Sequence, residues 1–133
     1  MSCSKKIVIV EDQIILNDML KNTISNTYNV VATSDDASEL IKLCDLYKPD
    51  LILTDICTKN NSSGIINGKK VKDKYGNKIK VLAMTGVPDI TFLNETKKAN
   101  LDGFIYKNIK KQTHHHDESG FKFLNAITKY FFS

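Results

Sequence analysis

Cysteine is scarce, and its spacing excludes two common ways of stabilising a small protein. The three cysteines are Cys3, Cys44 and Cys57, and no C-x-x-C pair occurs among them. Disulfide frameworks use an even set of cysteines, and structural zinc sites use closely spaced pairs. We therefore expect reduced thiols, which are typical of the cytoplasm.

Long apolar runs are lacking as well. The runs at residues 7–10 and 51–53 are far shorter than the roughly 20 residues that a membrane-spanning helix needs. The N-terminus leads into the first run without the longer apolar region and cleavage site of a secretory signal. These absences predict a soluble, cytoplasmic protein that does not bind membranes.

Charge of one sign is only in modest excess. The formal net charge is +4 at pH 7, and lysines are concentrated between residues 69 and 80. A basic cluster can bind nucleic acid or an acidic partner. No arginine is interleaved in this stretch, so we predict a solvated helix face and no direct contact with nucleic acid.

The length and the apolar pattern together predict one α/β domain. A chain of 133 residues can bury one core but cannot add a second folded module, so we expect a single domain over residues 1–133. Apolar segments predict strands at residues 7–10, 29–33, 51–54, 79–84 and 104–106, with amphipathic helices between them. Consecutive apolar residues in strands are typical of a parallel sheet covered on both faces. The pattern therefore predicts a doubly wound sheet.

Polar side chains follow four of the predicted strands. Glu11 and Asp12 follow the first strand, Asp55 the third, Thr85 the fourth and Lys107 the fifth. In open parallel sheets, ligands bind beyond the carboxyl ends of the strands. We therefore expect three carboxylates, a hydroxyl and an ammonium to lie together at one edge of the sheet.

These side chains suit the transfer of a phosphoryl group. Neighbouring carboxylates repel one another, and a hard divalent cation such as Mg²⁺ is the usual way to neutralise them. Asp55 could then act as a nucleophile, as carboxylates do in aspartyl-phosphate chemistry. The Lys107 ammonium and the Thr85 hydroxyl could stabilise charge on the phosphoryl oxygens.

The sequence resembles the receiver domains of response regulators from two-component signalling. The matching stretches are VED at residues 10–12, KPDLILTDI at 48–56, VLAMTG at 81–86 and ANLDGFIYK at 99–107. The resemblance covers about residues 5–108. It implies a flavodoxin-like (βα)5 sandwich whose five parallel strands have the order 2-1-3-4-5, followed by an inserted loop at residues 109–119 and a last helix at about 120–132.

The resemblance also implies roles for the residues at the strand ends. Asp55 would accept the phosphoryl group from a phosphohistidine of a histidine kinase or phosphotransfer protein. Asp12 and Asp55 would bind Mg²⁺ directly, Glu11 through a water molecule and Cys57 through its main-chain carbonyl. The protein would be a signalling domain rather than an enzyme.

Two further residues would report the phosphorylated state. Thr85 would move toward the phosphoryl group that Lys107 also contacts, and the side chain of Tyr106 would follow. This movement would switch the surface of the fourth helix, fifth strand and last helix, which could bind a downstream protein or a second copy of the chain. The exposed start of the first helix, with Ile14, Ile15 and Asp18, would receive the kinase.

The sequence departs from the family in the loop after Asp55. The usual Met-Pro pair is absent, and Asn67-Gly68 predicts a late helix start, so we expect a long mobile loop and a third helix of only residues 69–75. Asn100 replaces the usual glycine and should adopt a left-handed conformation. Asn108 replaces the usual proline, which predicts a trans peptide bond after Lys107.

The C-terminal part carries two further expectations. The three histidines at residues 114–116 could bind a metal, but adjacent residues rarely converge on one ion, so we predict a polar loop. The apolar arc of the last helix is broad for one buried face, which would leave Phe123 or Tyr130 for a partner. No DNA-binding or catalytic output domain is recognisable up to residue 133, so we expect that the protein either acts through a partner or is part of a longer chain.

Other functions fit less well. The glycines at residues 64–70 are too close together for a nucleotide-binding phosphate loop. The acidic first loop does not suit the phosphate of a flavin, as a flavodoxin requires. An aspartate-based phosphohydrolase would carry a D-x-D motif after the first strand, which this chain lacks. The remaining alternative is a pseudo-receiver, an interaction module that is not phosphorylated.

Overall fold

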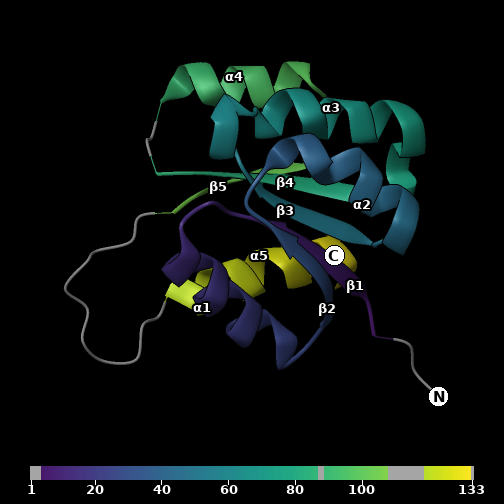
Figure 1. Ribbon diagram of the computed structural model, residues 1–133, viewed down its shortest axis with the longest axis vertical. Helices are drawn as coiled ribbons and strands as arrows, with labels where there is room; N and C mark the ends of the chain where they lie inside the picture. The colour runs from purple at the N-terminus through teal and green to yellow at the C-terminus, as the bar shows by residue number, and fades with distance from the viewer. Residues whose placement is uncertain (1–3, 87–88, 108–118, 133) are drawn as a thin grey trace.

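Five parallel strands alternate with helices in the computed structural model, which describes residues 4–86, 89–107 and 119–132 (Figure 1). The strands are β1 (Lys6–Val10), β2 (Asn29–Ser34), β3 (Leu51–Asp55), β4 (Lys80–Thr85) and β5 (Gly103–Tyr106). The helices are α1 (Ile14–Ser25), α2 (Leu40–Tyr47), α3 (Gly64–Tyr75), α4 (Ile90–Lys98) and α5 (Ser119–Phe132). Short 3-10 turns are η1 (Ala37–Glu39), η2 (Lys59–Asn61) and η3 (Gly76–Lys78). Within these ranges no helix is long and apolar enough to cross a membrane.

The strand order is β2-β1-β3-β4-β5, and all four pairings are parallel. Figure 1 shows α1 and α5 on one face of the sheet and α2, α3 and α4 on the other. This arrangement confirms the predicted doubly wound, flavodoxin-like sandwich. The order reverses direction between β1 and β3, so the carboxyl ends of these two strands flank the point where such folds bind ligands.

The strands are apolar on consecutive positions because both of their faces are covered. In β1, Ile7 and Ile9 belong to the core beneath α1 and α5, whereas Val8 and Val10 belong to the core beneath α2 and α3. All four side chains have no exposed surface. Successive side chains of a strand point to opposite faces, so a sheet between two helical layers needs apolar residues at every position.

The predicted bounds of the strands agree with the structure within one residue, but the predicted third helix is wrong. The helix α3 begins at Gly64, five residues before the predicted start at Lys69. The Ser63 hydroxyl accepts a hydrogen bond from the Ile66 amide at 3.0 Å, and serine is a favoured residue at this capping position. Asn67 and Gly68 therefore lie inside the helix and do not begin it.

Glycine starts this helix because the backbone of β3 passes close by. A Cβ atom at Gly64 would lie 1.9 Å from the main-chain oxygen of Asp55. The Gly64 amide also donates to the Ile56 carbonyl at 2.7 Å. The segment that resembles a phosphate loop is thus the first half of α3, packed directly against the end of β3.

The C-terminal expectations have mixed outcomes. Asn100 has a φ of 63°, which confirms the predicted left-handed conformation. Phe123 is fully buried, so the prediction that it is left for a partner is wrong. Tyr130 is half-buried, and its hydroxyl donates to the Asp102 carbonyl at 2.8 Å. The broad arc of α5 packs against both the sheet and α1. Asn108 and the histidines at residues 114–116 lie outside the described residues.

Within α3, the lysines form a solvated face with one exception. Lys69 and Lys74 are exposed and pair with acidic side chains at the surface. Lys72 instead is 5% exposed, and its ammonium contacts Asp102 at 2.8 Å. The same ammonium donates to the carbonyls of Gly76 and Ile79. Burial of this lysine is compatible with its charge because all three of its donors are used.

Candidate functional site

The backbone at the strand ends fixes where the polar residues lie. Three amides just beyond the strands continue the ladder toward the neighbouring strand. They are Glu11 to the Ser34 carbonyl at 2.9 Å, Ile56 to the Met84 carbonyl at 2.9 Å, and Lys107 to the Thr85 carbonyl at 2.7 Å. The side chains on these segments therefore start from rigid positions at one edge of the sheet.

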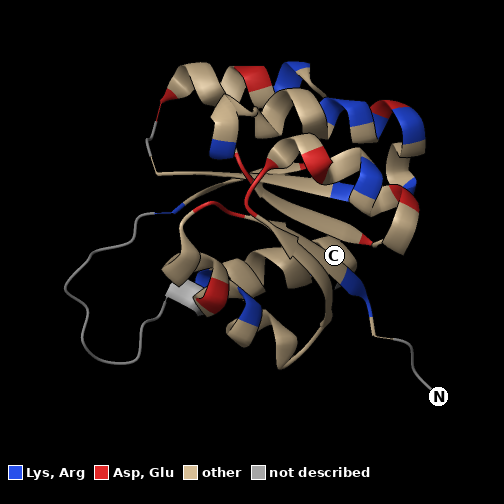
Figure 2. Cartoon of the chain, in the orientation of Figure 1, with Lys and Arg blue, Asp and Glu red and all other residues tan. Residues whose placement is uncertain are grey.

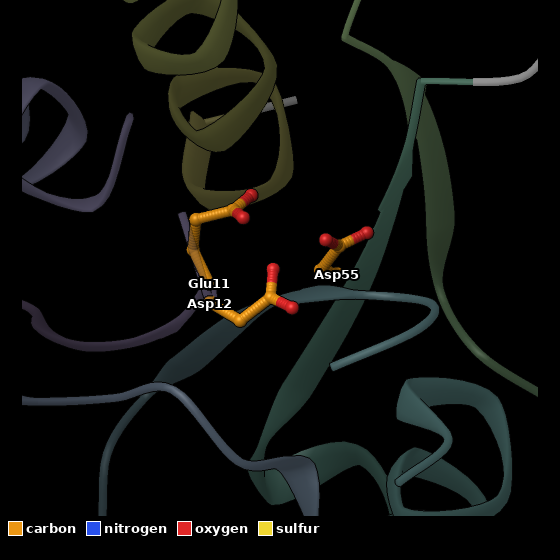
Figure 3. A group of neighbouring side chains, drawn as sticks. All are labelled: Glu11, Asp12 and Asp55. Carbon is orange, nitrogen blue, oxygen red and sulfur yellow. The ribbon is translucent and has the colours of Figure 1, made fainter. Parts of the chain in front are cut away.

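Three carboxylates gather at this edge. Carboxylate oxygens of Glu11, Asp12 and Asp55 all lie within 4.8 Å of one another. Figure 3 shows the Glu11 and Asp12 side chains leaving the loop after β1 and Asp55 leaving the end of β3. Figure 2 shows acidic segments meeting at the same edge. We call these three residues the acidic cluster.

Burial differs sharply within the acidic cluster. Glu11 is 1% exposed and Asp55 is 8% exposed, whereas Asp12 is exposed to solvent. Asp12 does not cap α1, because the N-cap residue of this helix is Gln13 and no side-chain cap hydrogen bond is made. The Gln13 amide instead donates to the Glu11 carboxylate at 3.0 Å. Asp12 thus presents its carboxylate to solvent beside two buried ones.

Lys107 joins the two buried carboxylates. Its Nζ atom donates to Glu11 Oε1 at 2.9 Å and to Asp55 Oδ2 at 3.1 Å. Lys107 itself is 8% exposed. One ammonium therefore faces three carboxylates among the described residues of the cluster, which leaves an excess of negative charge.

The pKa values reflect this imbalance. Burial, and then the charge of Asp55, raises the pKa of Glu11 from 4.5 to about 7. Burial also raises the pKa of Asp55, although Lys107 opposes the shift. Burial lowers the pKa of Lys107, but its two carboxylate partners outweigh this effect and raise it overall. The site thus favours binding of positive charge, from a proton or from a cation.

An open pocket lies beside Asp55. Its lining residues come from α1, α4, the ends of β3, β4 and β5 and the loops after β1, β3, β4 and β5: they are Gln13, Leu16, Asp55, Ile56, Cys57, Thr85, Gly86, Phe92, Tyr106 and Lys107. Thr85 is buried and Tyr106 half-buried. The structure thus brings Asp55, Thr85 and Lys107 to one pocket, as the strand-end pattern predicts, and Tyr106 lines the same pocket. Glu11 and Asp12 line a neighbouring pocket on the side of α1 and β2.

The donor set of the acidic cluster fits a hard divalent cation. Every side-chain ligand atom that it offers is a carboxylate oxygen, which Mg²⁺ prefers over nitrogen and sulfur. The Cys57 thiol is exposed at the pocket and is an unsuitable ligand for Mg²⁺, so this residue could contribute only its carbonyl.

Sequence reasoning missed two polar residues that join loops beside the site. Asn17 in α1 donates to the carbonyls of Glu11 and Ser34 at 2.9 and 3.3 Å. The Thr58 hydroxyl accepts a hydrogen bond from the Ala37 amide at 2.8 Å. The contacts to Ser34 and Ala37 join residues 17 and 21 positions apart, and a single sequence carries no signal for them. The absence of the family's Met-Pro pair at residues 58–59 is the one feature that draws attention to Thr58.

Comparison with known proteins gives a consistent result. Residues 7–117 match the family described as the response regulator receiver domain. Over 106 residues the chain is 32% identical to the oxygen regulatory protein NreC of Staphylococcus aureus (strain JH9), which covers 77% of this chain and 48% of that protein. The chain therefore spans about half the length of the curated relatives that it matches.

Solved structures show the same fold. The signal receiver domain of the response regulator NarL from Mycobacterium tuberculosis has a TM-score of 0.81 and 17% identity, with 97% of each chain covered. The response regulator domain of Thermotoga maritima CheB has a TM-score of 0.80 and 21% identity, with 95% of each chain covered. At these identities the likeness concerns the fold alone.

Proposed function

Because the chain belongs to the response regulator receiver domain family, we propose that it accepts a phosphoryl group on Asp55 from a histidine kinase or a phosphotransfer protein. The observation that carries the proposal is the Lys107 ammonium, which contacts both Asp55 and Glu11 at the edge of an acidic cluster. As a receiver domain of a two-component system, it is a signalling protein and not a classical enzyme. We take residues 1–133 as one such domain, acting in the cytoplasm.

The reaction joins an Asp55 carboxylate oxygen to phosphorus. The bond between phosphorus and the imidazole nitrogen of the donor breaks, and that nitrogen keeps the electron pair and takes up a proton. Lys107, already 3.1 Å from Asp55, would then pair with a phosphoryl oxygen. Thr85, at the same pocket, would donate its hydroxyl to another.

Receiver domains typically bind Mg²⁺ at acidic residues, and the acidic cluster supplies such residues here. Asp12 and Asp55 would hold the ion directly, Glu11 through a water molecule and Cys57 through its main-chain carbonyl. An ion held there would neutralise negative charge on the phosphoryl oxygens. The chain's own contribution is to hold its ligand oxygens in fixed positions at the ends of rigid strands.

Phosphorylation would change the conformation of one surface of the domain. Thr85 ends β4 and Tyr106 ends β5, so a movement of Thr85 toward the phosphoryl group would free space for the half-buried Tyr106 ring. The surface of α4, β5 and α5 would then bind a downstream protein or a second copy of the chain. At the other side of the site, Ile14 and Ile15 are 77% and 85% exposed, and we propose that they contact the kinase.

Intact-mass measurement tests the proposal. The protein is incubated with acetyl phosphate, with and without Mg²⁺, beside the variants Asp55→Asn and Asp73→Asn. Asp73 is an exposed residue of α3 and serves as the matched control. We expect a gain of one phosphoryl group that requires Mg²⁺, is lost in Asp55→Asn and is kept in Asp73→Asn. An unchanged mass of the wild-type protein in every condition would refute it and favour the pseudo-receiver alternative.

A further inference from the structure

The loop after Asp55 is attached to the loop after β2 through one buried hydroxyl. Thr58 is 4% exposed. Its Oγ1 atom accepts a hydrogen bond from the Ala37 amide at 2.8 Å and donates to the Ser62 carbonyl at 3.1 Å. This side chain therefore connects three segments: its own loop, the start of η1 and the residues that lead into α3.

Main-chain hydrogen bonds add to this attachment. The Thr58 amide donates to the Ser62 carbonyl at 2.9 Å, and the Lys59 amide donates to the Asp35 carbonyl at 3.0 Å. Cys57 and Ser63 form an isolated antiparallel bridge. The predicted long, mobile loop after Asp55 is thus a short closed turn whose two arms are hydrogen-bonded to each other and to the loop after β2.

Cys57 lies between two fixed points. On one side the Ile56 amide is hydrogen-bonded to β4, and on the other side the hydroxyl of Thr58 is held by Ala37. A residue between two such anchors has little freedom to turn its peptide groups. If the Thr58 hydroxyl is removed, the second anchor is lost and the buried Ala37 amide loses its acceptor.

We propose that Thr58 is a positioning residue, whose hydroxyl holds the Cys57 main-chain carbonyl at the acidic cluster and thereby sets the affinity for the divalent cation. This inference rests on the proposed function, because it assigns a support to one of the ligands proposed there. Replacing a residue that orients a metal ligand from behind typically lowers metal affinity by about 10- to 100-fold.

The test compares two variants of the full chain. Thr58→Val keeps the shape of the side chain and removes the hydroxyl, whereas Thr58→Ser keeps the hydroxyl. Titration calorimetry with MgCl₂ on the unphosphorylated protein gives the affinity. Hydrogen exchange of the Ala37 amide, followed by NMR without any cation, reports whether the hydrogen bond to Thr58 is present.

We expect Thr58→Val to bind Mg²⁺ about 10-fold more weakly, with faster exchange at Ala37, and Thr58→Ser to restore both values. Phosphorylation of Thr58→Val by acetyl phosphate should reach the wild-type rate at saturating Mg²⁺. A residue that only supported the fold would not show this separation between affinity and maximal rate.

Two results would overturn the inference alone. One is a Thr58→Val protein that binds Mg²⁺ as tightly as the wild type although exchange at Ala37 is faster. The other is a loss of the folded state in Thr58→Val, because the hydroxyl would then support the fold and not the cation site. Wild-type protein that binds no Mg²⁺ would instead overturn the proposed cation site, and this inference with it.

Discussion

Replacing Glu11 by glutamine should stabilise the protein at neutral and alkaline pH. Glu11 is 1% exposed and lies beside Asp55, and burial together with that charge raises its pKa from 4.5 to about 7. A raised carboxyl pKa means that the folded state disfavours the ionised form. The stability that protonated Glu11 contributes is fully present below pH 4.5 and is lost as the pH rises through about 7.

The size of the effect follows from the shift. One pKa unit corresponds to about 1.4 kcal/mol, so the rise from 4.5 to about 7 costs the wild-type protein about 3 kcal/mol of unfolding free energy by pH 8. Glutamine cannot accept hydrogen bonds from both the Gln13 amide and the Lys107 ammonium, which the two Glu11 oxygens now do. This loss costs about 1 kcal/mol. The net gain of Glu11→Gln at pH 8 is therefore about 2 kcal/mol.

Urea unfolding at several pH values measures the difference. Wild type, Glu11→Gln and Glu95→Gln are compared between pH 5 and pH 8 in EDTA, Glu95 being an exposed residue of α4. We expect the Glu11→Gln protein to gain stability relative to the wild type as the pH rises, while Glu95→Gln follows the wild type. Added Mg²⁺ should stabilise the wild type at pH 8 more than it stabilises Glu11→Gln. Parallel stability curves for wild type and Glu11→Gln would refute the reasoning, because Glu11 would then titrate normally.

Two further substitutions test the packing around the site. Lys72→Met removes the ammonium of a buried ion pair and should destabilise the protein by about 3 kcal/mol in urea unfolding, whereas Lys69→Met on the exposed face of α3 should cost less than about 0.5 kcal/mol. Equal effects of the two would show that the Lys72 pair is as weak as a surface pair. Gly64→Ala places a Cβ 1.9 Å from the Asp55 carbonyl oxygen and should cost about 3 kcal/mol, while Gly86→Ala, with its nearest contact at 3.9 Å, should be close to neutral. A Gly64→Ala protein of wild-type stability would show that α3 can move away from β3 at little cost.

The strands could be predicted because their signal is local and regular, whereas their order was implied by the resemblance to receiver domains. Ile7 to Val10 is apolar on every position, which only a sheet covered on both faces requires. The same regularity predicted the site, since the carboxyl ends of parallel strands share one edge. Asp55 lies 44 residues after Glu11, and Lys107 lies 52 residues after Asp55, yet Lys107 contacts both carboxylates.

The start of α3 shows where local signals mislead. Asn67 and Gly68 look like the beginning of a helix when each residue is weighed by its own preference. In the structure Gly68 is buried inside α3, where a Cβ would lie 3.1 Å from Leu101 and 3.2 Å from Val81. The residue is small because another part of the chain packs on it, and a single sequence does not contain that reason.

The sequence by itself determined the alternation of strands and helices, the common edge of the sheet at which Glu11, Asp55 and Lys107 lie, and the left-handed turn at Asn100. These features depend on the preferences of neighbouring residues and on the geometry of parallel strands. Only the tertiary structure decided that Lys72 is buried and that Thr58 holds the Ala37 amide. Such contacts join residues far apart in the chain, and their free energy comes from burial and from hydrogen-bond partners that exist only once the layers have packed.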